Sequence, residues 1–229
     1  MRGYGQYCPI ARGAEIFATR WTPIIVRNLL YGCRTYTELL DGAPGIPRSL
    51  LSQRLHQLER YGLVRKSPNP AGRGWRYQPT PACEDLRAVC AALGTWGSTW
   101  LETTEQHLDP YVALWTLSRG LASVRLPPGR VTLRFELSAA PRGQSRFWLL
   151  VQRPESEVCV QTPGFAEDVV IRTDPAWLAE WVQGKVSLRQ GIRSEQVVVD
   201  GAPGLVRSLN GWAEAAAQTL VSLGSAASG

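Results

Sequence analysis

The segment RSLLSQRLHQLER, residues 48–60, gathers side chains that donate and accept hydrogen bonds. An exposed helix face ordinarily favours Glu and Lys, but Glu59 is the single carboxylate of this segment. Short polar groups near a helix N-terminus, flanked by arginine, have the chemistry that reads base edges in a DNA major groove. The predicted base contacts are Arg48, Ser49, Ser52, Gln53 and His56. Arg60, at the end of the segment, is predicted to contact phosphate.

This polar face needs a helix that holds it against a core. At 100° per residue, Leu51, Leu55 and Leu58 fall within about 60° of one another, opposite the polar face. We expect this apolar stripe to be buried. Pro47 is expected at the first helical position, and Gly62 is expected to follow the end of the helix.

Two earlier helices are marked by their caps. The first is predicted to have Thr22 as its N-cap, with proline at the first helical position, and to end at Gly32. In the second, Thr35 and Glu38 have the spacing of a capping box. Three short helices joined by tight turns predict a helix-turn-helix core. Arg34 and Thr35, at the start of the second helix, are further candidates for phosphate contact.

The sequence LVRKSPNPAGRGWRYQP, residues 63–79, predicts a β-hairpin directly after the third helix, with a tip rich in proline and glycine. A hairpin in this position is a wing, and Lys66 and Arg73 are its predicted phosphate contacts. A solvated hairpin is the alternative. In either case, Trp75 and Tyr77 are expected to pack on the core.

A further helix is predicted at residues 82–106, with an apolar stripe that includes Val89, Leu93, Trp96 and Trp100. The stripe is longer than a small winged domain requires. It indicates helix-to-helix dimerisation or, as the alternative, packing on the second half of the chain.

Charge is concentrated in the first part of the chain. Residues 1–82 hold 12 Arg and Lys against 4 Asp and Glu, a net charge of +8, whereas the remaining residues have a net charge of −2. This asymmetry indicates a polyanionic partner for the N-terminal part, with a solvated basic surface as the alternative. The 5 cysteines form no C-x-x-C pair and there are only 2 histidines. We therefore expect no metal site, no disulfide scaffold and no cofactor.

Several protein classes are disfavoured by the composition. No apolar run approaches the roughly 18 residues of a membrane span, so a cytoplasmic protein is expected. The N-terminus is too short and too polar for a signal peptide. The sequence has no nucleophile elbow and no phosphate-binding glycine loop, and we expect that the chain is not an enzyme. The acid pair Glu167 and Asp168 is interpreted as a solvated turn.

Residues from about 7 to 104 resemble the HxlR-type winged helix-turn-helix regulators. The matching residues are Cys8-Pro9, Arg20-Trp21-Thr22, Tyr36, Glu38-Leu39, Leu51-Ser52, Arg54-Leu55, Leu58-Glu59 and Gly62-Leu63-Val64. The resemblance implies a homodimeric, DNA-binding transcription regulator whose first and last winged-domain helices form the dimer. Some members of the family sense electrophiles or oxidants through a cysteine that matches Cys8. The alternative role for Cys8 is a small hydrophobic residue buried in the dimer.

The second half of the chain predicts an α+β domain. Alternation at residues 130–137 is typical of a half-buried strand, and further short strands and helices follow. We expect an antiparallel sheet with helices packed on one side. The predicted domains are therefore 1–106 and 107–229.

Residues from about 165 to 212 resemble the sterol-carrier-protein type domain. The matching residues are Thr173, Asp174, Leu178, Gly184, Leu188, Val199, Gly201 and Leu205. That family implies an apolar tunnel for lipids or other hydrophobic molecules. The candidate lining residues are Phe147, Trp148, Val158, Val160, Trp177 and Trp181, for each of which ordinary core packing is the alternative.

Together these features predict a homodimeric transcription regulator that binds double-stranded DNA. Its control is assigned to a hydrophobic small-molecule effector or to oxidation of Cys8. The alternative is a carrier or sequestering protein for hydrophobic ligands that uses its winged half only for dimerisation.

Overall fold

The computed structural model describes residues 3–70, 72–102, 104, 107–121, 124–126, 128–140, 143–152 and 156–222. The chain forms two compact units, one built on Met1–Thr99 and the other on Trp100–Ser222. The predicted boundary, after Gln106, falls on a residue outside the described ones. None of the helices in the described part combines the length and apolar character needed to cross a membrane.

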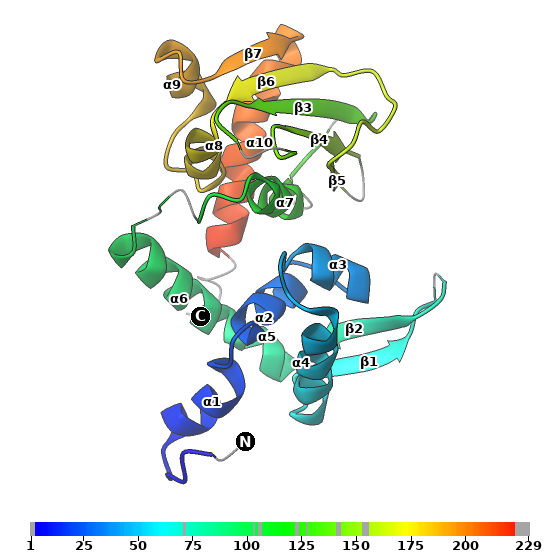
Figure 1. Cartoon of the computed structure of the whole chain (residues 1–229), viewed down its shortest axis with the longest axis vertical. Coiled ribbons are helices and arrows are strands. Elements are labelled where there is room, and N and C mark those ends of the chain that lie inside the picture. The colour runs from blue at the N-terminus through cyan, green and yellow to red at the C-terminus, as the bar shows by residue number, and fades with distance from the viewer. Residues whose placement is uncertain are drawn as a thin grey trace. The chain divides into compact units, whose positions relative to one another are not determined.

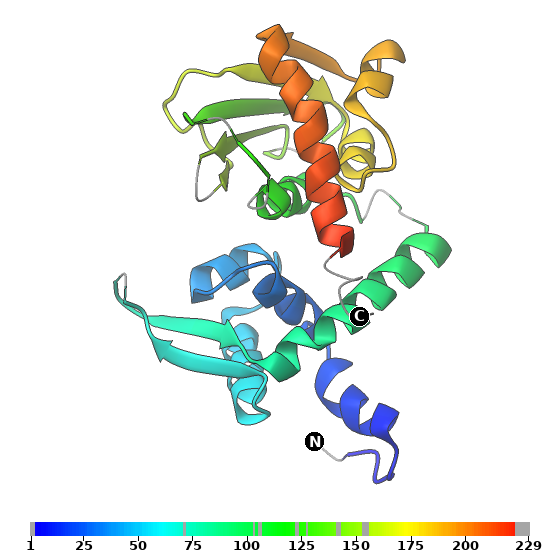
Figure 2. The same ribbon diagram turned by 180° about the vertical axis from the view of Figure 1, so that it is seen from behind.

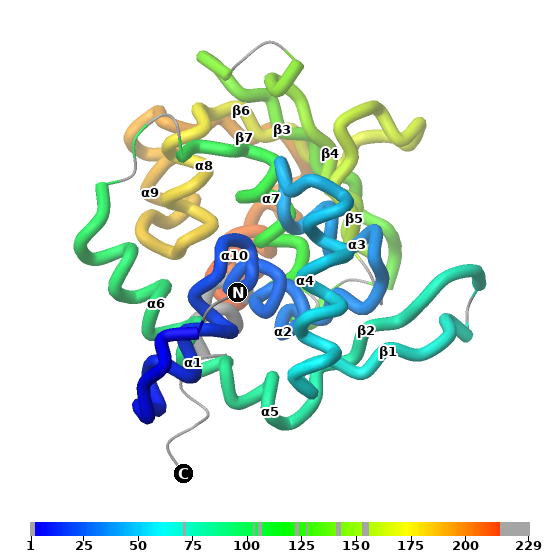
Figure 3. The backbone as a smooth tube through the Cα atoms, turned by 60° about the horizontal axis from the view of Figure 1, so that its bottom comes forward, coloured from blue at the N-terminus to red at the C-terminus, as the bar shows by residue number. Residues whose placement is uncertain are grey.

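The first unit is a group of helices from which a two-stranded hairpin projects (Figures 1 and 3). Its elements are α1 (Pro9–Phe17), α2 (Thr22–Leu30), α3 (Tyr36–Asp41), α4 (Arg48–Arg60), β1 (Val64–Pro68), β2 (Trp75–Pro79), α5 (Pro81–Glu84) and α6 (Leu86–Trp100). Leu51, Leu55 and Leu58 of α4 are buried with Leu29 and Leu39 from the two preceding helices. Removing one such buried leucine costs about 2–5 kcal/mol. The predicted buried stripe of α4 is confirmed.

Some helix boundaries differ from the sequence prediction. Thr22 is the first residue of α2 and not its cap, and its hydroxyl lies 2.6 Å from the hydroxyl of Thr19. The N-cap is Trp21, which has a φ of 76°, a left-handed backbone that is rare for a bulky side chain. The single terminal helix that we predicted is divided into α5 and α6 at Asp85.

The second unit packs a five-stranded sheet against helices. Its elements are α7 (Pro110–Gly120), β3 (Val131–Leu137), β4 (Arg146–Val151), β5 (Ser156–Cys159), β6 (Val169–Thr173), α8 (Pro175–Val182), α9 (Leu188–Arg193), β7 (Val198–Gly201) and α10 (Pro203–Ser222). The strand order is β5-β4-β3-β6-β7. The predicted α+β class is confirmed, but the sheet is mixed and not antiparallel throughout. The chain crosses from β5 to the far side of β3, where β6 pairs with β3 in parallel.

Three helices of this unit, α7, α8 and α10, lie on one face of the sheet (Figure 2). The buried cluster between them and the sheet includes Leu114, Phe135 and Trp181. Helix α7 was not predicted from the sequence, although Asp109 and Pro110 mark its start. The Asp109 carboxylate accepts a hydrogen bond from the backbone N–H of Tyr111 at 2.9 Å. This Asp-Pro pair is the signal that could have located the helix.

Candidate nucleic-acid interface

The predicted polar face lies on the outer surface of α4. Its residues Arg48, Ser49, Ser52, Gln53, His56 and Arg60 are all exposed. The nearest carboxylate on the helix is that of Glu59, whose Oε2 lies 4.0 Å from Nδ1 of His56. The helix therefore presents donors and acceptors over most of its length with little negative charge. Their contact with bases and phosphate remains a prediction.

A tyrosine of α3 holds the first turn of this helix. The Tyr36 hydroxyl donates a hydrogen bond to the carbonyl of Arg48 at 2.8 Å, and it accepts one from the Ser52 hydroxyl at 3.5 Å. These contacts fix α3 against the part of α4 that carries the predicted base contacts. This role of Tyr36 could not be predicted from the sequence, because the distance between two helices cannot be read from the spacing within either one.

A partly buried set of polar contacts holds α2 against α3. Arg27 donates from Nη2 to the Asn28 side-chain oxygen at 2.9 Å and to the carbonyl of Gly42 at 2.8 Å. The Asn28 amide donates to the carbonyl of Leu39 at 3.4 Å. Burial lowers the pKa of Arg27 from its ordinary value. Because the Gly42 carbonyl lies at the end of α3, these bonds help to set the turn between α3 and α4.

Arg34 and Thr35, both candidates for phosphate contact, make hydrogen bonds within the protein. Arg34 donates from Nη1 to the carbonyls of Leu29 and Cys33 at 2.6 and 2.9 Å, next to the end of α2. The Thr35 hydroxyl accepts from the backbone N–H of Glu38 at 3.3 Å, and the Glu38 carboxylate accepts from the Thr35 N–H at 2.8 Å. The predicted capping box is confirmed. Both residues thus have structural roles, and phosphate contact by either one remains a prediction.

The hairpin β1–β2 has the predicted antiparallel pairing, with Lys66 opposite Tyr77 and Pro68 opposite Trp75. Tyr77 is buried on the core as predicted, and burial raises the pKa of its hydroxyl. The same prediction is wrong for Trp75, which is 50% exposed, because the strand has left the core at this position. The ammonium of Lys66 lies 4.4 Å from the centroid of the Trp75 ring. Arg73, at the tip, is exposed.

Helices α1 and α6 have no buried residue. Ile10 of α1 is exposed, and so is the apolar stripe of α6 that consists of Val89, Leu93, Trp96 and Trp100. Cys8 is half-buried and is the N-cap residue of α1. None of the five cysteines, which all lie in the described part of the chain, is in a disulfide. Cys83 is fully buried, and this burial, together with the nearby carboxylate of Glu84, raises the pKa of its thiol to about 12.

The predicted ligand-lining residues of the second unit do not all lie together. Phe147, Trp177 and Trp181 belong to one buried cluster, and Val158 packs at its margin. The rings of Trp177 and Trp181 are stacked, with their centroids 5.8 Å apart. Val160 is 58% exposed and lies outside this cluster.

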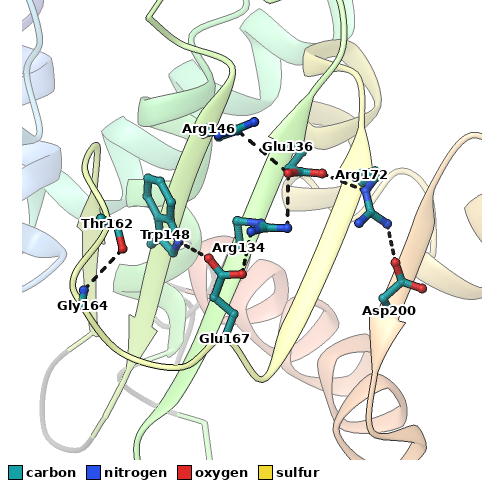
Figure 4. A network of polar contacts seen from close by, with 9 residues as sticks. All are labelled: Arg134, Glu136, Arg146, Trp148, Thr162, Gly164, Glu167, Arg172 and Asp200. Carbon is teal, nitrogen blue, oxygen red and sulfur yellow. Dashed lines mark hydrogen bonds and ion pairs between the residues drawn. The ribbon is translucent and has the colours of Figure 1, made fainter.

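Trp148 points away from that cluster, into a polar network on the other face of the sheet (Figure 4). Its indole N–H donates to Oε1 of Glu167 at 2.9 Å, and Oε2 of Glu167 pairs with Nη1 of Arg134 at 2.7 Å. The carboxylate of Asp168 accepts from the backbone N–H of Thr132 at 2.8 Å. Asp168 is exposed in a bend, as interpreted, but Glu167 is partly buried and both carboxylates have partners. They attach the connection between β5 and β6 to strands β3 and β4.

Helices α2, α3 and α4, followed by the hairpin β1–β2, define a winged helix-turn-helix with the polar face of α4 directed outward. The family model described as HxlR-like helix-turn-helix matches residues 16–105. The chain belongs to this family.

Two curated relatives illustrate the match. The uncharacterized HTH-type transcriptional regulator sll1512 of Synechocystis is 31% identical over 99 residues, which cover 43% of this chain and 73% of the relative. The uncharacterized HTH-type transcriptional regulator Rv3095 of Mycobacterium tuberculosis is 34% identical over 114 residues, covering 44% and 72%. Among solved structures, the chain is similar to sterol carrier protein domain 2 of Helicoverpa armigera, with 12% identity and a TM-score of 0.37, over 51% of this chain and 94% of that one.

Proposed function

We propose that this protein is a homodimeric transcription regulator of the cytoplasm that binds double-stranded DNA at specific sequences. The observation that carries the proposal is the exposed face of α4, which combines hydrogen-bonding side chains with a near absence of carboxylates. Membership of the HxlR-like helix-turn-helix family and the names of the two relatives, both HTH-type transcriptional regulators, support it.

In the proposed complex, the first half of α4 enters the major groove. The side chains that contact base edges are Arg48, Ser49, Ser52, Gln53 and His56. Gln53 is the most informative of them, because a carboxamide donates and accepts at once and can pair with adenine through two hydrogen bonds. The side chains that contact phosphate are Arg34, Thr35, Arg60, Lys66 and Arg73, which add affinity without reading sequence.

The dimer is proposed to form through α1 and α6. Val89, Leu93, Trp96 and Trp100 recur on one side of α6 and are 45–72% exposed. Ile10 of α1 is 82% exposed. An apolar stripe of this kind is the usual mark of a surface that another chain covers. Two copies of α4 related by a two-fold axis would read half-sites about 34 Å apart, or a multiple of that distance.

The second unit is proposed to bind a hydrophobic small-molecule effector. Support comes from Trp177, which is 3% exposed and whose indole N–H has no hydrogen-bond partner among the described residues. An unpaired buried donor costs about 1–3 kcal/mol. An apolar ligand that carries one acceptor would remove this cost on entering the cluster around Trp177 and Trp181. Oxidation of Cys8 is the other proposed route of control.

The experiment for DNA recognition is a selection of bound sequences from random duplex DNA with the full-length protein. The proposal expects enrichment of a two-fold symmetric sequence and an affinity that falls steeply with salt. Binding without sequence preference and without salt dependence would leave the carrier of hydrophobic ligands as the better description. Mass spectrometry of the gently purified protein tests the effector, because a co-purifying hydrophobic molecule is expected. That molecule should be lost in Trp177→Phe more readily than in the exposed control Trp100→Phe.

A further inference from the structure

The wing carries a tryptophan that the protein's own core does not use. Tyr77 and Val64 lie on the same face of the hairpin and are 8% and 3% exposed, so they close its base against the helices. Trp75, two residues before Tyr77, is the first residue of β2 and so lies nearer the tip. The hairpin projects from the helices toward that tip (Figures 1 and 2). Trp75 is 50% exposed, and the exposed half of its surface does not stabilise the unit by burial.

A cation accompanies the exposed ring. The Lys66 ammonium lies 4.4 Å from the Trp75 ring centroid, within the range of a cation–π contact. Both side chains lie on the face that the buried residues Val64 and Tyr77 share, as the pairing of Lys66 with Tyr77 and of Pro68 with Trp75 requires. The hairpin thus offers one positive charge and one apolar surface side by side.

We propose that the Trp75 ring packs against a deoxyribose of the bound DNA while Lys66 pairs with an adjacent phosphate. A sugar–phosphate unit has an apolar sugar next to an anion, which matches the pair on the wing. The net charge of +8 over residues 1–82 and the exposed Arg73 at the tip make DNA the partner that fits. This inference rests on the proposed function and adds an apolar contact to a wing whose other contacts are ionic.

The two kinds of contact differ in their response to salt. The logarithm of the affinity falls as the logarithm of the salt concentration rises. Loss of one phosphate contact reduces the steepness of this fall (its slope) by about 0.9. Loss of an apolar contact releases no counterion, so it weakens binding by the same factor at every salt concentration. Burial of roughly 60 Å² of ring surface corresponds to about a tenfold effect on affinity.

The test measures affinity of the full chain for a selected duplex over a salt series. Trp75→Thr, which suits a strand, and Trp75→Ala are expected to bind about tenfold more weakly with an unchanged slope, whereas Lys66→Ala should lower the slope by about 0.9. Phe165→Ala is the matched control, because Phe165 is also exposed under a cation, with the Arg130 guanidinium carbon 3.4 Å from its ring centroid, but lies in the other unit. Thermal unfolding of each variant establishes that it is folded.

Three results would overturn the inference. If both Trp75 variants are folded and bind DNA with unchanged affinity, the Trp75 ring makes no contact with DNA that contributes to binding. A slope lowered as in Lys66→Ala means that the ring serves only to position the ammonium. An equal loss in Phe165→Ala means that the effect is not local to the wing. If the unmodified protein binds no duplex at all, the proposed function itself fails. In the three results above the unmodified protein still binds DNA, so they contradict only the role of Trp75.

Discussion

Single residues in the winged unit divide into those that face outward and those that hold the helices. Gln53 and Arg73 are exposed, whereas Arg27 is partly buried and Cys83 is fully buried, and both act on the fold. This division explains why the outward-facing residues were easier to predict from the sequence than the residues that hold the helices. An unusual exposed face departs from what solvent favours, but a partly buried residue such as Arg27 looks like any other arginine until its partners are known.

Cys83 gives a prediction at this scale. Its thiol has a pKa raised from 9.0 to about 12 by burial. Well below pH 9 the thiol is protonated in both the folded and the unfolded chain, so its ionisation does not affect stability. Between pH 9 and about 12 it ionises first in the unfolded chain, and the free energy of unfolding should therefore fall as pH rises. Urea unfolding over this range should show a smaller fall in Cys83→Ala than in the unmodified protein, and equal falls would contradict the assignment.

At the scale of elements, patterns within one helix or strand were predictable, and contacts between elements were not. The leucine stripe of α4 and the capping box of Thr35 depend on spacing along the chain, and both are confirmed. The parallel pairing of β3 with β6 and the packing of Glu167 on Trp148 depend on where the chain crosses the sheet. Trp75 was predicted to pack on the core together with Tyr77, but it is 50% exposed, since strand pairing does not show where the hairpin leaves the core.

Tyr36 tests how α3 positions α4. Tyr36→Phe removes the hydrogen bond to the Arg48 carbonyl and leaves the ring in place. A net hydrogen bond is worth about 0.5–1.5 kcal/mol, so the free energy of unfolding should fall by about that amount. DNA affinity should fall by up to about 12-fold, because the first turn of α4 is then held less firmly. Tyr61→Phe is the control, because Tyr61 is an exposed tyrosine at the end of the same helix. Equal affinities for the two variants would show that the contact between α3 and α4 does not support recognition.

The whole molecule combines a winged helix-turn-helix unit with a second unit that is proposed to receive a signal. Specific recognition of a symmetric site requires two copies of α4, so the proposed function depends on the proposed dimer. The sequence predicted both units and their classes. It could not predict what the buried cluster around Trp177 accepts, because the same aromatic residues serve as a core and as a ligand site.

Trp96 tests the dimer. Trp96→Glu places a charge in the exposed apolar stripe of α6 and should convert the dimer to a monomer in sedimentation experiments, with loss of binding to the symmetric duplex. Ser98→Glu is the control, since residue 98 is exposed on the opposite side of the same helix. A dimer that persists in Trp96→Glu would place the interface elsewhere.

The most direct measurement of the central claim compares the sequences selected from random DNA by the unmodified protein, Gln53→Ala and Arg73→Ala. If α4 reads bases, Gln53→Ala should lose preference at one position of each half-site, a change of about 1–3 kcal/mol for that base pair. Arg73→Ala should bind more weakly to all sequences and keep the same preference, because it contacts phosphate. An unchanged preference in Gln53→Ala, together with loss of all binding in Arg73→Ala, would contradict direct reading by this face.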